Sequence, residues 1–179
     1  MKSRGFTIVE LLIVIVVIAI LAAISIVAYN GIQQRAKNNQ TITSLNAYAK
    51  ALKSYYAINQ NLQGTTGCYG KAGTTCGNVT DNTAACSSIG QANYEAGFGD
   101  AIKTVMSTIP EPSNQEITCG GAKYRGVLYV NFGYAMAVYS FLKGVTQCPV
   151  ISGSEIYDTT GVSKPFGDGY LCAYVVSGA

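Results

Sequence analysis

A long apolar run near the N-terminus dominates the hydrophobic pattern of this chain. No charged residue occurs from Leu11 to Ile32, a stretch of 22 residues, and Ser25 alone is polar between Leu11 and Ala28. As a helix the run would span roughly 33 Å, enough to cross the hydrocarbon core of a bilayer. A helix that is apolar all round must lie in lipid or inside a protein bundle.

The pattern changes to a helical period after residue 32. Apolar side chains then recur at steps of three and four, at Ile42, Leu45, Ala49, Leu52 and Tyr56, with polar or small residues opposite at Thr43, Ala47, Lys50 and Ser54. Because no proline interrupts the stretch from Phe6 to about Ile58, we predict one long helix whose second half packs on a domain along one face. Gly31 is the weakest helix former in it and the expected point of bending.

The remainder of the chain predicts a small mixed domain. Gln60 to Asn93 is rich in Gly, Thr, Asn and Ser and is expected to be loop, and Phe98 to Ile109 has the spacing of a short helix that Pro110 ends. Three runs rich in β-branched and aromatic residues follow, at Tyr124–Phe132, Tyr134–Leu142 and Tyr170–Val176. We therefore predict an α+β fold in which a three-stranded antiparallel sheet packs on the long helix.

Composition limits the chemistry. The 179 residues are 49% hydrophobic and 12% charged, with a formal net charge of +3 and neither His nor Trp. The chain thus lacks the commonest general base and metal ligand, and it shows no nucleophile elbow, phosphate-binding loop or convincing pair of acids. We expect no catalytic residue, no cofactor and no enzymatic activity.

The six cysteines all follow the apolar run. Their even number, without C-x-x-C pairs or His, fits disulfides better than zinc, which stays as the alternative. Disulfides form in oxidising compartments, so the domain after the helix is expected outside the cytoplasm. The basic Lys2 and Arg4 also allow a removed signal peptide, but the apolar run is too long for one and Glu10 interrupts its start.

The segment Lys2-Ser3-Arg4-Gly5-Phe6-Thr7-Ile8-Val9-Glu10-Leu11-Leu12 resembles the start of type IV pilins and pseudopilins. The resemblance implies a membrane peptidase that cuts between Gly5 and Phe6 and methylates the new amino group of Phe6. It also implies a helical homo-oligomeric filament, built on an assembly platform from subunits that first lie in the cytoplasmic membrane. Four parts are expected: a leader at 1–5, a membrane and filament-core helix at 6–32, its amphipathic second half at 33–58, and an extracellular head at 59–179.

Glu10 is the candidate assembly residue. A carboxylate in hydrocarbon is costly unless it is neutralised, and the ammonium of Phe6 in a neighbouring subunit would pair with it and set the register. The alternative is that Glu10 merely lies at the level of the lipid headgroups. Thr7 is expected to hydrogen-bond the helix terminus.

The resemblance also bears on the cysteines, since many pilins have one C-terminal disulfide loop. Cys148 and Cys172 flank a Gly- and Ser-rich segment between strands and are the expected pair. The other four allow three connectivities, which stay open: Cys68, Cys76, Cys86 and Cys119.

Two further groups of residues carry weak signals. Glu155, Asp158 and Asp168 allow a calcium loop, but their irregular spacing favours solvated acids. Lys123, Tyr124 and Arg125 would suit contacts with DNA phosphates, although solubilising charges on an edge strand explain them better. Nucleic acid is therefore unsupported as a partner.

The expected function is a structural one: a major or minor pilin that polymerises into a filament for adhesion, motility or DNA uptake. The alternative within the family is a pseudopilin of a type II secretion or competence machine. A remote alternative is a single-span, membrane-anchored binding domain, which would keep its N-terminus uncut and stay monomeric.

Overall fold

A computed structural model describes residues 5, 7–61, 66–69, 74–78, 91–94, 96–108, 110–132, 135–152, 155–156 and 163–177. The chain divides into two compact units, Met1–Ala36 and Lys37–Ala179. The first contains the apolar part of the long helix. The second, the head, contains the rest of that helix and all the strands that the structure describes.

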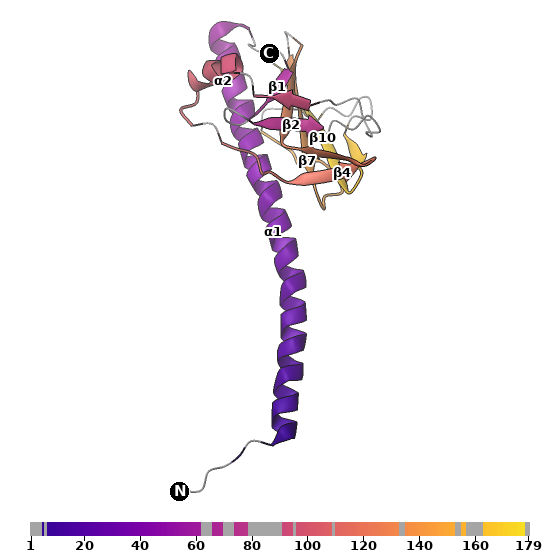
Figure 1. Ribbon diagram of the computed structural model, residues 1–179. Coiled ribbons are helices and arrows are strands. Elements are labelled where there is room, and N and C mark those ends of the chain that lie inside the picture. Colours follow the sequence, from indigo (N-terminus) through magenta and orange to yellow (C-terminus); the bar gives the residue numbers. More distant parts are fainter. Residues whose placement is uncertain are drawn as a thin grey trace. The chain divides into compact units, whose positions relative to one another are not determined.

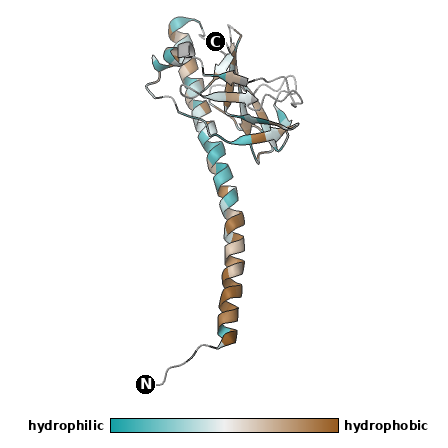
Figure 2. Cartoon of the chain, viewed as in Figure 1, coloured by the Kyte–Doolittle hydropathy of each residue, from teal (hydrophilic) through white to brown (hydrophobic). Residues whose placement is uncertain are grey.

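Helix α1 runs without interruption from Ile8 to Asn59 (Figure 1). The predicted long helix is therefore confirmed, and it continues through Asn30 and Gly31. Every side chain at 8–33 is exposed, and Figure 2 shows this part of α1 as the most hydrophobic segment of the chain. In the head, one face of α1 becomes buried, beginning at Asn38.

The larger sheet contains two of the predicted strands and part of the third. Its order is β1 (Thr66–Cys68), β6 (Val127–Asn131), β7 (Ala135–Leu142), β10 (Gly169–Ser177) and β8 (Glu155–Ile156), and β9 (Lys164–Phe166) also pairs with β10. All pairs are antiparallel, with Tyr139 of β7 opposite Leu128 of β6 and Ala173 of β10. The predicted antiparallel arrangement of β6, β7 and β10 is confirmed.

A second sheet was not predicted. It has the order β3 (Gln91–Asn93), β2 (Thr75–Asn78), β5 (Ala122–Arg125) and β4 (Glu116–Cys119). The expected single strand Tyr124–Phe132 is wrong: β5 and β6 belong to different sheets, with Gly126 between them at φ 74°. Only glycine adopts this backbone conformation readily, and it lets the chain pass from one sheet to the other. The β-forming residues on both sides of Gly126 made the run look like a single strand.

Two other expectations are corrected. The segment Gln60–Asn93 was expected to be loop but contains β1, β2 and β3, whose short polar sequences lack an alternating pattern. Helix α2 (Ala96–Lys103) ends earlier than predicted. Val105 and Met106 follow it in a turn, half-buried against the core, because apolar spacing reports which residues are buried rather than the backbone that carries them.

The core lies between α1 and the larger sheet. Leu45, Ala49 and Leu52 of α1 are buried in one cluster with residues of β7 and β10, which confirms the predicted apolar face. Within it the ring of Tyr69 contacts those of Tyr48 and Tyr129 at tilted angles, with ring centroids 3.5 and 5.1 Å apart. A second cluster, around Tyr124, Phe141 and Phe166, fills the space on the other side of β7.

Candidate functional site

The start of α1 is capped by its own side chains. The Thr7 N–H and the Thr7 hydroxyl both donate to Glu10 Oε2, at 2.9 and 2.7 Å, and the Glu10 N–H donates to Thr7 Oγ1 at 3.3 Å. This reciprocal pattern is a capping box, in which Thr7 is the N-cap and Glu10 the third helical residue. The expected bond from Thr7 to the helix terminus is present, and the T-x-x-E spacing was the signal for the reciprocal bond from Glu10.

Gly5 is the one described residue before the cap. Gly5 is exposed, and a Cβ added to it would meet nothing within 4 Å. Phe6 and residues 1–4 lie outside the described residues. The expected cleavage, the methylation of Phe6 and its pairing with Glu10 therefore stay predictions.

By length and composition, the helix that follows the cap could cross a membrane. No residue of its most apolar 18-residue stretch is buried. The large side chains from Ile8 to Ile32 are each about half or more exposed. Such a surface needs lipid or other apolar helices around it.

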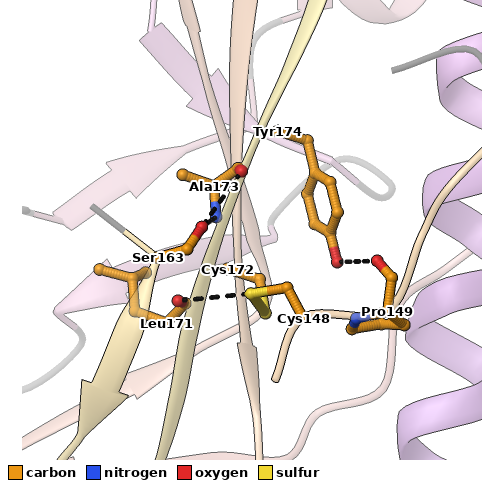
Figure 3. Close-up of a disulfide and its surroundings, with 7 residues drawn as sticks. All are labelled: Cys148, Pro149, Ser163, Leu171, Cys172, Ala173 and Tyr174. Atoms are coloured by element: carbon orange, nitrogen blue, oxygen red, sulfur yellow. Dashed lines mark hydrogen bonds between the residues drawn. A yellow bond between two sulfur atoms is a disulfide. The ribbon is translucent and has the colours of Figure 1, made fainter. Parts of the chain in front are cut away.

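Disulfides lie in the head. Cys148 is bonded to Cys172, the expected pair, with Cα atoms 5.5 Å apart, and Cys68 is bonded to Cys76 with Cα atoms 5.7 Å apart. Cys119 is also disulfide-bonded, while Cys86 lies outside the described residues. Figure 3 shows that the Cys148 bridge holds its segment beside β10, where the Tyr174 hydroxyl donates to the Pro149 carbonyl at 2.9 Å.

Asp168 joins the two sheets, a role that the sequence did not indicate. Its Oδ1 accepts the Thr118 N–H of β4 at 2.6 Å, its Oδ2 pairs with Lys143 Nζ at 2.6 Å, and its own N–H donates to the Thr118 carbonyl at 3.1 Å. The Lys143 hydrogen bond and, to a smaller extent, that of Thr118 lower the pKa of Asp168 despite some desolvation. Neighbouring Gly167 has a φ of 59°, and a Cβ there would collide with the Thr118 carbonyl.

The calcium loop has no support in this geometry. Asp168 is engaged as above, Asp158 lies outside the described residues, and the Glu155 side chain is not described. Within the described parts of the chain, no three acidic, His or Cys side chains form a group that would hold a metal ion.

The residues considered for contacts with DNA phosphates either pair with an acid of the head or are buried in it. Lys123 and Arg125 pair with Glu116 at 3.3 and 3.5 Å, and Tyr124 is fully buried. The expectation that they lie on an edge strand is wrong, because β5 pairs with β2 on one side and β4 on the other.

The N-terminal segment is similar to that of known proteins. The model of the prokaryotic N-terminal methylation motif matches residues 1–26. The type IV major pilin protein PilA of Myxococcus xanthus is 43% identical over 56 residues, which cover 31% of this chain and 26% of that protein. The chain thus matches about a quarter of the length of this relative, and no solved structure matches it. Taken with the capped apolar helix and the α+β head, these matches support a relationship between this chain and type IV pilins.

Proposed function

We propose that the chain is cut between Gly5 and Phe6, is methylated on the Phe6 amine, and polymerises through α1 into an extracellular pilus. The membrane would hold the subunit before assembly, and the processing peptidase and an assembly platform would be its partners. The relationship to pilins points to a structural protein. We favour a surface-displayed filament over a pseudopilin because several disulfides cross-link the head. Such cross-links stabilise the fold, which is an advantage for a fibre exposed to shear and proteases.

The observation that carries this proposal is the geometry at the first turn of α1. Glu10 is an isolated acid at the start of an apolar helix, and Thr7 engages only its Oε2. Among the described residues, Oε1 accepts no hydrogen bond. The carboxylate therefore caps its own helix through one oxygen and retains the other for a cation.

The ammonium of Phe6 in a neighbouring subunit is the proposed cation. It appears only after cleavage, so assembly would be coupled to processing. Between apolar helices an unpaired carboxylate is costly, and a subunit packed out of register would leave Glu10 unpaired. One ion pair would thus select the axial register, much as a single buried polar residue does in coiled coils.

Glu10→Gln separates the cap from the charge. Glutamine at the third helical position still completes a capping box, so the helix should begin at the same residue and cleavage should persist. Without the negative charge the register contact is lost, and we expect the yield of sheared filaments to fall at least tenfold. Thr7→Ala is the matched control, because it removes the cap and keeps the charge. Wild-type filament yield from Glu10→Gln would contradict the proposed pairing.

Gly5→Ala tests the cleavage position. A Cβ at Gly5 meets no atom within 4 Å, so the substitution leaves the fold intact, and a failure of processing would report on the peptidase. We expect the precursor to accumulate in the membrane, as measured by intact mass. Gly31→Ala, where an added Cβ also meets nothing, should be processed normally. A mature Gly5→Ala chain that begins at Phe6 in normal amounts would show that cleavage does not depend on glycine at position 5.

A further inference from the structure

The basic residues of α1 differ from most of the described basic residues after it, of which Lys164 alone has no ion pair. Lys103, Lys123, Arg125 and Lys143 each lie within 4 Å of a carboxylate. Arg35, Lys37, Lys50 and Lys53, the basic residues of α1, are all exposed, and none of them forms an ion pair with any described residue. After Glu10, α1 contains no acid at all. No described residue therefore neutralises its positive charge.

Arg35 and Lys37 occupy a particular depth along the helix. No charged residue separates Glu10 from Arg35, and α1 is helical throughout. At about 1.5 Å per residue the two lie roughly 37 Å apart along the axis, slightly more than the hydrocarbon thickness of about 30 Å. Tyr29, 60% exposed, precedes Arg35 by less than two turns, at the level where aromatic side chains favour the membrane interface.

We propose that Arg35 and Lys37 bind the phosphate groups of anionic phospholipids at the outer face of the bilayer before assembly. This inference rests on the proposed function, since it needs α1 to span the membrane. Phosphate oxygens match both side chains: the guanidinium binds them in a bidentate manner, and the ammonium binds as a point charge. The apolar stems of both residues can follow the helix while their charged ends reach the headgroups.

Processing would make this contact more important. Cleavage after Gly5 removes Lys2 and Arg4, the basic residues on the other side of the span. Arg35 and Lys37 then become the side-chain cations nearest to either boundary of the bilayer. Bound headgroups would hold the helix at a fixed depth, and the subunit would exchange these lipids for neighbouring subunits as it enters the filament.

Lipid selectivity can be measured on the full processed chain in vesicles. Because the chain has no Trp, Ile32→Trp provides a single fluorophore close to Arg35. Its quenching by dibrominated phosphatidylglycerol and by dibrominated phosphatidylcholine gives the relative binding constant of the two lipids. Each basic residue near a membrane surface is worth about fivefold, so the two together should give a preference for phosphatidylglycerol of roughly 25-fold that weakens with salt.

The double variant Arg35→Gln with Lys37→Gln should bring this preference close to one. Its matched control, Lys50→Gln with Lys53→Gln, makes the same charge change in the head part of α1 and should keep the preference. An unchanged preference in the first variant, or an equal loss in the control, would overturn the inference.

A second fluorophore separates this inference from the proposed function. Ile20→Trp lies midway along the apolar part of α1 and should be quenched by lipids brominated near the ends of their chains. If it is quenched while Arg35 and Lys37 show no lipid preference, only the lipid contact fails. If it is not quenched, α1 does not span the bilayer, and the membrane stage of the proposed function fails with the inference.

Discussion

Asp168 illustrates how a single side chain decides the arrangement of the head. Its turn lies between β9 and β10 of the larger sheet, yet its carboxylate and its N–H bind the backbone of Thr118 in β4 of the other sheet. Strand β4 is at the edge of that sheet, and Asp168 satisfies backbone groups that would otherwise face outward. An edge covered in this way is protected from pairing with another chain.

Asp168→Asn should destabilise the head at neutral pH by about 0.5–1 kcal/mol, because Lys143 loses its ion pair at a partly exposed site. The folded pKa of Asp168 lies below its unfolded value, so its charge stabilises the fold above the unfolded pKa. That contribution disappears as the pH falls through the folded pKa. Unfolding of the full chain in detergent at pH 7 and near pH 2 would measure both effects.

Asp100→Asn is the control for this prediction, since Asp100 pairs with Lys103 within the single helix α2. It should change the free energy of unfolding by only a few tenths of a kcal/mol. A difference between wild type and Asp168→Asn that stays the same at both pH values would show that the charge is not its cause.

At the scale of elements, the second half of α1 combines two kinds of contact. Its apolar residues enter the core, while Asn38 and Thr41, both buried, bond segments that pass over the helix. The Asn38 amide donates to the Lys143 carbonyl at 2.8 Å, and the Ser113 N–H donates to Thr41 Oγ1 at 3.1 Å. Apolar contacts supply most of the stabilisation, and these polar contacts select the position of the segments along the helix.

Leu52→Ala tests the apolar contacts. Leu52 is 1% exposed within the main cluster, and truncating a leucine in such a position removes buried area and leaves a cavity. We expect the free energy of unfolding to fall by about 2–5 kcal/mol. Ser54→Ala, two residues away on the exposed side, should change it by about 0.5 kcal/mol at most. Equal effects of the two substitutions in denaturant titrations would contradict the assignment of the buried face.

At the scale of the whole molecule, the disulfides restrain different lengths of chain. Cys148 and Cys172 are 24 residues apart in sequence, whereas Cys68 and Cys76 are 8 apart. A disulfide stabilises chiefly by restricting the unfolded chain, and the restriction grows with the loop it closes. We therefore expect the Cys148–Cys172 disulfide to contribute more to the free energy of unfolding than the Cys68–Cys76 disulfide.

Replacing Cys148 and Cys172 together by Ala should cost about 3.5 kcal/mol, against about 2.6 kcal/mol for Cys68 and Cys76. Denaturant unfolding of the two double variants, each with its other bridges intact, would compare the losses directly. A larger loss from the Cys68 and Cys76 variant would show that native-state contacts, rather than loop length, determine what each bridge contributes.

Much of the molecule could be predicted from the sequence because the evidence for it is local. The helical period of Leu45, Ala49 and Leu52 identified the buried face of α1, and the length of the apolar run identified a helix that suits a bilayer. The capped start of the helix also has a local signal in the sequence, because Thr7 and Glu10 interact across one turn. Strands β7 and β10 also followed from their local composition, whereas β6 was only part of the run that was predicted as a strand.

The second sheet and the contacts of Asp168 depended on residues far apart in the chain. Residues 75–78 are polar and carry no strand pattern, and they became a strand because β5 and β3 supply their hydrogen-bond partners. Asp168 and Thr118 are 50 positions apart, and no local pattern joins them. By itself, the sequence determined the membrane-length helix, its cap and its buried face, because these arise from residues within a few turns of one another. Only the tertiary structure decided how the strands divide between two sheets and which side chains join them, because those choices depend on partners that folding brings together.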